Sequence, residues 1–211
     1  MFPAEEESRF RSPGKSISGS PEIIMKEKTI HSKTEFVGKL LRLEVQEVEL
    51  EDGTRSVREI VRHSGAAAVL AMLDEDRFLL VKQFRKAIEA YSTEIIAGTL
   101  DPGEDPETCA RREVEEETGH RVARMERLGE VIPSPGYLDE RITVFRAVVF
   151  PADTELSTDE DERVDPTEVT RAELIEMLKT GEITDAKTLA AWGLHETIQP
   201  MRLFGEADVS S

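Results

Sequence analysis

Three glutamates stand at helical spacing between Glu113 and Glu117. Glu113, Glu116 and Glu117 occupy positions i, i+3 and i+4, which puts their carboxylates on one face of a helix. Like charges in this arrangement repel each other by roughly a few tenths of a kcal/mol per pair. Divalent ions such as Mg²⁺ or Mn²⁺ would neutralise the face, because hard cations prefer oxygen ligands. The alternative interpretation is an ordinary solvated acidic surface.

Residues around this acidic face could support a metal site. Arg112 adjoins Glu113 and precedes Glu116 by four positions, so its guanidinium can hold a carboxylate in place. Gly98 and Gly103 lie upstream and allow the backbone to turn tightly and to approach bound ions closely.

The elements that must position these residues can be read from caps and periodicity. Asp105 and Pro106 begin a helix that ends at Gly119. Thr170 and Glu173 form a capping box for a second helix that runs to Lys179 and is ended by Gly181. A last helix covers about 185–198 and is stopped by Pro200. Strands are expected at 41–50, 56–63, 65–73, 77–84, 93–97 and 142–150. This order predicts an α+β fold or a mixed-sheet α/β sandwich.

Composition excludes several classes of function. The 211 residues include 27 Lys and Arg against 44 Asp and Glu, a formal net charge of −17. Such acidity argues against nucleic-acid binding and against adhesion to anionic membranes. The single cysteine, Cys109, forms no disulfide framework or zinc motif. We expect no secretory signal and no membrane span, and a cytoplasmic location. Low-hydrophobicity segments predict a flexible leader at 1–22, an acidic linker at 151–166 and a flexible tail at 201–211.

The spacing of the acidic helix and its upstream loop follows the Nudix box, G-x5-E-x7-R-E-U-x-E-E-x-G-U, in which U is a bulky aliphatic residue. Seven fixed positions match: Gly98, Glu104, Arg112, Glu113, Glu116, Glu117 and Gly119. The last U position departs, since it holds His120, and Val122 is a candidate to replace its packing. The chain therefore resembles the Nudix hydrolases.

Residues 35–198 resemble the ADP-ribose pyrophosphatase branch of that superfamily. Pro135 follows Gly119 at the branch's offset of sixteen residues, within the loop sequence PSPGYLDE. VKQFR, STEIIAG and GEITDAKTLAAWGLH resemble other segments of the branch. The resemblance implies an α/β/α sandwich with a mixed central sheet and an N-terminal antiparallel sheet. It divides the chain into an N-terminal β region at 23–63 and a hydrolase domain at 64–200.

The implied activity is Mg²⁺-dependent hydrolysis of ADP-ribose to AMP and ribose 5-phosphate, with Mn²⁺ as another possible ion and two or three ions per site. The implied ligands are Glu113, Glu116, Glu117 and the backbone carbonyl of Ala97, with Glu104 as a supporting acid. The branch places a general base after the S-P-G sequence, which corresponds to Glu140. Glu116 is the alternative base.

Substrate recognition is expected from four further residues. Arg85 would bind substrate phosphate, and Arg58 would bind phosphate or ribose. Phe36 and Tyr137 are candidates for stacking on adenine. The resemblance also implies a homodimer with exchanged N-terminal sheets. Two alternatives stay open: a pyrophosphatase for another nucleotide sugar such as GDP-mannose, and a catalytically silent nucleotide-binding module.

Overall fold

The computed structural model describes residues 26–151 and 164–198. The leader at 1–22, the tail at 201–211, Pro200 and most of the acidic linker fall outside the described residues. The strands are β1 (Lys28–Val37), β2 (Leu41–Glu49), β3 (Arg55–His63), β4 (Ala66–Met72), β5 (Arg77–Arg85), β6 (Ala90–Glu94), β7 (Ile96–Thr99), β8 (His120–Val131), β9 (Ile142–Pro151) and β10 (Val164–Thr170). The helices are α1 (Pro106–Thr118), α2 (Arg171–Thr180), α3 (Ala186–Thr197) and the short 3₁₀ turn η1 (Lys86–Ile88).

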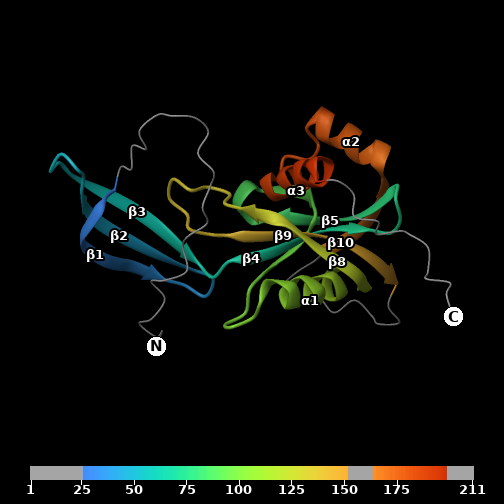
Figure 1. The fold of residues 1–211 in the computed structure, drawn as a ribbon, viewed down its shortest axis with the longest axis horizontal. Helices are drawn as coiled ribbons and strands as arrows, with labels where there is room; N and C mark the ends of the chain where they lie inside the picture. The colour runs from blue at the N-terminus through green and yellow to red at the C-terminus, as the bar shows by residue number, and fades with distance from the viewer. Residues whose placement is uncertain (1–25, 152–163, 199–211) are drawn as a thin grey trace.

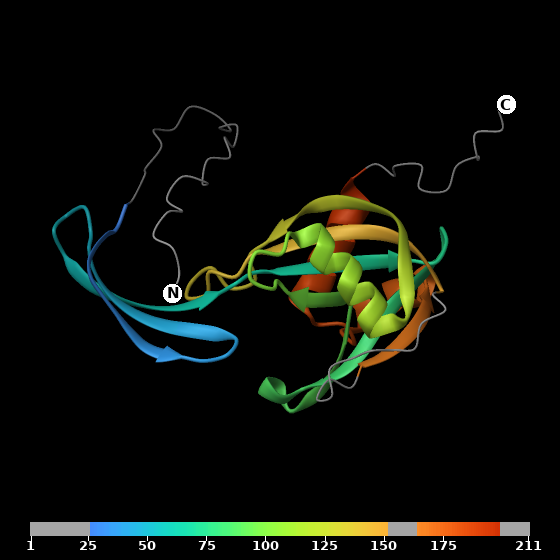
Figure 2. The same cartoon turned by 90° about the horizontal axis from the view of Figure 1, so that it is seen from below.

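These strands form two sheets. β1, β2 and β3 make a three-stranded antiparallel sheet that projects from the main body (Figures 1 and 2). The main sheet has the order β10-β5-β4-β9-β8, with β6 paired to β5 and β7 paired to β4. β4 and β9 run parallel, whereas the other pairs are antiparallel. The predicted mixed sheet and N-terminal antiparallel sheet are confirmed.

Helices cover both faces of the main sheet, as predicted. β4 is buried along its whole length, and its alternate side chains enter two separate cores. One core joins Leu70 to Leu174 of α2 and Ala191 of α3, whereas the other joins Val69 to Val114 of α1. Figure 1 shows α2 and α3 on one side of the sheet and α1 on the other. The acidic helix is therefore fixed by the packing of its apolar face.

The predicted helix ends are confirmed. The Asp105 side chain accepts hydrogen bonds from the backbone amides of Glu107 and Thr108, and Gly119 ends α1 with a φ of 66°. Thr170 and Glu173 form the reciprocal capping box of α2. These local signals therefore set where the acidic helix α1 and the helix α2 start and stop.

The predicted strand at 93–97 is divided in the structure. β6 ends at Glu94 and pairs with β5, while β7 starts at Ile96 and pairs with β4. Between them, the Ile95 amide donates to Thr188 Oγ1 at 2.9 Å instead of continuing the ladder. This break lets one short segment serve two different neighbouring strands.

The predicted linker at 151–166 is wrong at its C-terminal end. Val164–Thr170 forms β10, which pairs with β5 along its length. Pro166 is tolerated because β10 lies at the edge of the sheet. β1 and β8 were not predicted either: β1 is exposed throughout, and two register shifts interrupt the alternation of β8.

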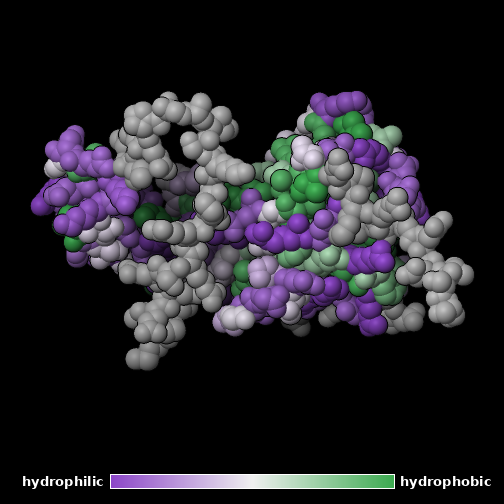
Figure 3. Space-filling view, viewed as in Figure 1, coloured by the Kyte–Doolittle hydropathy of each residue, from purple (hydrophilic) through white to green (hydrophobic). Residues whose placement is uncertain are grey.

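No helix in the described ranges is long and apolar enough to cross a membrane. Figure 3 shows hydrophilic residues over most of the visible surface of the N-terminal sheet, and hydrophobic residues gathered near α2 and α3.

Candidate active site

The three glutamates of α1 lie at the edge of the main core. Glu113 and Glu117 are 8% and 3% exposed, whereas the side chain of Glu116 is 41% exposed. α1 packs through Val114 into the core beside β4, and Glu113 and Glu117 flank this packed side of the helix. The helix thus presents two buried carboxylates and one accessible carboxylate.

Arg112 joins these carboxylates to the preceding loop. Its Nη1 donates to Glu113 Oε1 at 2.6 Å and to Glu116 Oε2 at 3.0 Å. Its Nε and Nη2 each donate to Glu104 at 3.0 Å. The hydrogen bonds from Arg112 lower the pKa of Glu104, and those to Glu104 raise the pKa of Arg112 against the effect of partial burial. Glu104 of the loop and Glu113 and Glu116 of the helix are therefore one connected ionic cluster.

Gly98 brings the backbone of β7 against this cluster. A Cβ atom at Gly98 would lie 1.7 Å from Glu113 Oε1 and 1.9 Å from its Cδ, so no other residue fits without moving Glu113. Ala97 immediately precedes Gly98 on β7. The structure therefore brings the predicted ligand strand to the predicted ligand helix.

Cys109 supports the same contact from the inner side of α1. Its thiol donates to Gly98 O at 3.5 Å and is buried. Burial raises the pKa of this thiol to about 12. Cys109 therefore acts as packing, not as a nucleophile.

The chemistry of this donor set fits a hard divalent cation. The carboxylates of α1 and the loop are oxygen donors, and the β7 backbone approaches them where only glycine fits. Among the residues that the structure describes, no three His, Cys, Asp or Glu side chains converge on one point. Arg112 Nη1 instead donates to both Glu113 and Glu116, so its guanidinium offsets part of their negative charge.

Arg85 belongs to a second ionic cluster. Its Nε and Nη2 donate to the two oxygens of Glu94 at 2.8 and 2.5 Å, and Lys187 also donates to Glu94. Burial alone would raise the pKa of Glu94, but Arg85 and Lys187 lower it to about 2. The hydrogen bonds to Glu94 raise the pKa of Arg85 against the effect of burial, and the charges of Glu94, Asp185 and Glu117 act in the same direction as these bonds.

Tyr137 and Glu140 lie on the loop between β8 and β9. Tyr137 is 56% exposed, and its carbonyl accepts a hydrogen bond from Val61 N at 2.7 Å. Glu140 Oε1 lies 3.6 Å from His63 Nδ1. Both candidate residues are thus held against β3.

Arg58 and Phe36 lie on the projecting sheet. Arg58 donates to Glu27 at 3.0 and 2.5 Å, and Phe36 is 54% exposed near the end of β1. Within one chain, the sheet that carries both residues projects away from α1 (Figure 2). Their role in substrate binding stays a prediction.

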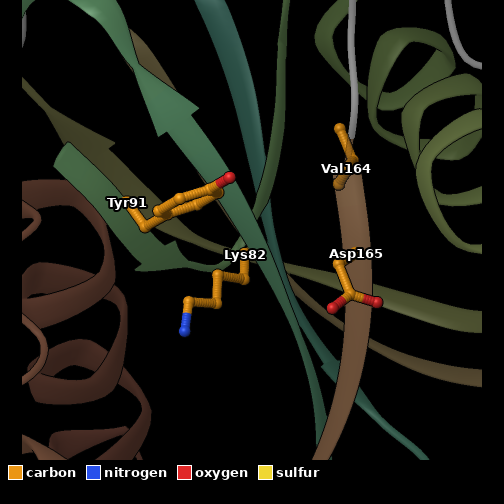
Figure 4. Close-up of a pocket in the computed structure, with 4 residues that line it drawn as sticks. All are labelled: Lys82, Tyr91, Val164 and Asp165. Carbon is orange, nitrogen blue, oxygen red and sulfur yellow. The ribbon is translucent and has the colours of Figure 1, made fainter. Parts of the chain in front are cut away.

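A surface pocket of about 410 Å³ lies elsewhere, between β5, β6 and β10. Lys82, Tyr91, Val164 and Asp165 line it (Figure 4). It contains none of the predicted site residues, so we do not assign the reaction to it.

Sequence reasoning missed Glu94, Lys187 and Asp139. Lys187 is 93 positions from Glu94, and Asp139 is 77 positions from its partner Arg62. The available signals were that Glu94 lies within STEIIAG, Asp139 within PSPGYLDE and Lys187 within GEITDAKTLAAWGLH.

Comparison with known proteins gives one family and several relatives. The NUDIX domain family matches residues 62–192. The chain is 44% identical over 168 residues to the ADP-ribose pyrophosphatase of Bacillus subtilis (strain 168), covering 79% of this chain and 91% of that protein. It is 43% identical to the methanol dehydrogenase activator of Bacillus methanolicus, over 80% of this chain and 91% of the relative.

Two further matches have lower sequence identity. The GDP-mannose pyrophosphatase of Cronobacter sakazakii is 36% identical over 65% of this chain and 80% of its own length. A crystal structure of an ADP compounds hydrolase superposes with a TM-score of 0.72 at 22% identity, covering 85% of this chain and 95% of that one. The latter match supports the fold.

Proposed function

This chain belongs to the NUDIX domain family, and on that basis we propose that it is a Mg²⁺-dependent ADP-ribose pyrophosphatase that yields AMP and ribose 5-phosphate. The observation that carries the proposal is the contact between the Gly98 backbone and Glu113, within an intact set of box acids joined by Arg112. The substrate follows from the Bacillus subtilis relative, which is named for this activity.

The α1 carboxylates supply the sites for divalent ions in this proposal. Glu113, Glu116, Glu117 and the Ala97 carbonyl would hold two or three Mg²⁺ ions, with Glu104 supporting them through Arg112. When bound, such ions neutralise pyrophosphate charge and acidify the attacking water. Mn²⁺ would serve as an alternative, since it shares the preference for oxygen ligands.

The protein's own groups would position the substrate and move one proton. Arg85, oriented by Glu94, would bind a phosphate oxygen. Water attack forms one new P–O bond and breaks the anhydride P–O bond, and Glu140 or Glu116 would accept the proton that the water releases. Glu140 is held on an ordered loop, whereas Glu116 is closer in sequence to the other box acids. The rate of Glu140→Gln separates the two: a fall of at least about 100-fold would support Glu140 as the base, whereas near-normal turnover would return that role to Glu116.

The projecting sheet suggests a homodimer. Phe36, Val37 and Leu40 are 54%, 71% and 57% exposed on or beside it, and such an apolar area favours a protein partner. In a homodimer with exchanged sheets, Phe36 and Arg58 would reach the site of the partner, with Tyr137 as the other stacking candidate. We place the enzyme in the cytoplasm. Sedimentation equilibrium of the full chain would test the assembly, and a monomer would contradict it.

The activity is tested with a panel of ADP-ribose, GDP-mannose and other nucleotide sugars, each with Mg²⁺ or Mn²⁺. Phosphate released by an added phosphatase reports hydrolysis, because intact ADP-ribose carries no terminal phosphate. Fastest turnover with ADP-ribose is expected. Preference for GDP-mannose would assign that nucleotide sugar as the substrate in place of ADP-ribose. Binding without turnover would indicate the silent nucleotide-binding module.

A further inference from the structure

The loop that carries Tyr137 and Glu140 is joined to β3 by its backbone. The Val61 amide donates to Tyr137 O at 2.7 Å, and the Asp139 amide donates to Val61 O at 3.1 Å. Val61 and Leu138 form a parallel bridge. Figures 1 and 2 both show this loop beside the end of β3. The loop therefore extends the N-terminal sheet by one short backbone pairing.

Asp139 adds two side-chain contacts to this pairing. Its Oδ1 accepts a hydrogen bond from the His63 amide at 2.9 Å, and its Oδ2 accepts one from Arg62 Nη1 at 2.9 Å. Each carboxylate oxygen of Asp139 thus accepts a hydrogen bond from a different donor on β3. The two bonds together fix the position and the orientation of Asp139 relative to this strand.

Arg62 is itself fixed from the other side. Its Nε donates to Glu44 Oε2 on β2 at 2.9 Å, and Glu44 is 9% exposed. Arg42 also contacts Glu44, at 2.8 Å. The charges therefore alternate from Arg42 through Glu44 and Arg62 to Asp139, so the loop is tied to two strands of the N-terminal sheet.

Gly65 and Ala66 connect the end of the same loop to β7, the strand that carries the candidate ligand Ala97. The Gly65 amide donates to His63 Nδ1 at 3.1 Å, and the Gly65 carbonyl accepts from Leu100, which directly follows β7, at 3.1 Å. The next amide, that of Ala66, donates to Arg141 O at 2.9 Å. The N-terminal sheet, the loop and the β7 strand that contacts Glu113 are thus joined at one point.

From these contacts we infer that Asp139 is a positioning residue, which fixes the Tyr137–Glu140 loop relative to the acidic helix by clamping it to Arg62 and to the His63 amide. This inference rests on the proposed function, because it assigns the loop a place at the reacting phosphate. It adds a dependence of turnover on the N-terminal sheet, through Glu44 and Arg62.

The test compares Asp139→Ala and Asp139→Asn with the wild type in ADP-ribose hydrolysis and in amide hydrogen exchange. Loss of the clamp should lower kcat by roughly 10- to 100-fold with little change in KM, as expected if the loop that carries Glu140 is misplaced by about 1 Å. Exchange should quicken at the amides of residues 61 and 139 and stay unchanged in α1. Asp139→Asn keeps an acceptor for the His63 amide, so its kcat should lie between those of Asp139→Ala and the wild type.

Asp74→Ala is the matched control. Asp74 Oδ1 also accepts from a backbone amide, that of Arg77 at 2.8 Å, and its Oδ2 accepts from the Arg77 guanidinium at 2.7 Å, but it lies in the turn between β4 and β5. This variant should keep the wild-type kcat. If Asp139→Ala fails to fold, Arg62→Gln, which removes the Arg62 contact and leaves the His63 contact in place, should lower kcat to the intermediate level expected of Asp139→Asn.

Two results would overturn the inference while the proposed function stands. One is an active wild type with unchanged kcat in the variants despite faster loop exchange. The other is unchanged exchange at residues 61 and 139. A wild type that is inactive toward ADP-ribose would instead overturn the proposed function, and the catalytic relevance of Asp139 with it.

Discussion

Gly98 and Glu113 are in contact so close that a single added methyl group cannot fit between them. The Cβ of any other residue at position 98 would lie 1.7 Å from Glu113 Oε1. This contact brings the backbone of β7 to the acidic face of α1. It explains physically why a glycine opens the box, since the Glu113 side chain would otherwise have to move.

Gly98→Ala should displace the Glu113 side chain and leave the fold intact, because the obstructing atoms belong to a side chain that can rotate. We expect ADP-ribose turnover to fall about 100-fold, with a small change in melting temperature. Gly193→Ala in α3 is the control, since no atom lies within 4 Å of its Cβ position. Full activity in Gly98→Ala would contradict the importance of the contact.

Arg112→Gln should make the protein depend on divalent ions for stability. The variant leaves Glu104, Glu113 and Glu116 without their shared cation, which should cost roughly 1–3 kcal/mol of unfolding free energy. Added Mg²⁺ should therefore raise its melting temperature more than it raises that of the wild type. Arg111→Gln, which removes an exposed pair with Glu107, should show the wild-type response. Equal Mg²⁺ shifts in all three proteins would contradict the claim that Arg112 and divalent ions offset the charge of the same acids.

The Glu94 cluster predicts a specific loss of stability in acid. The pKa of Glu94 is lowered from 4.5 to about 2, so the folded state favours the ionised form. Its contribution is complete above about pH 4.5 and is lost as the pH falls toward about 2. The free energy of unfolding, measured with urea across this pH range, should decline more steeply with falling pH in the wild type than in Glu94→Gln. Glu89→Gln, at an exposed pair with Lys86, should follow the wild type, and identical slopes for Glu94→Gln would refute the linkage.

Cys109 should be chemically inert while the protein is folded. Burial raises the pKa of its thiol to about 12, so almost no thiolate is present near pH 8. Iodoacetamide should label it only after denaturation. Stoichiometric labelling of the native protein would show that α1 opens readily from the sheet.

Local patterns in the sequence predicted the parts of the site that depend on local geometry. Glu113, Glu116 and Arg112 interact within one helix, and Asp105 and Gly119 set its ends. The Arg85–Glu94–Lys187 cluster and the Asp139–Arg62 clamp were not predicted, because they join residues distant in sequence. β8 and β10 were missed for a related reason: edge strands with bulges or proline lack the clear alternation that a buried face imposes.

The most direct test of the account is ADP-ribose hydrolysis by Glu117→Gln at saturating Mg²⁺, compared with Glu115→Gln. Glu117 lies on the acidic face and is 3% exposed, whereas Glu115 is on the same helix and pairs with Arg121 at the surface. We expect a loss of at least about 100-fold in kcat for Glu117→Gln and near wild-type turnover for Glu115→Gln. Unchanged turnover in Glu117→Gln would contradict the assignment of the metal site to α1.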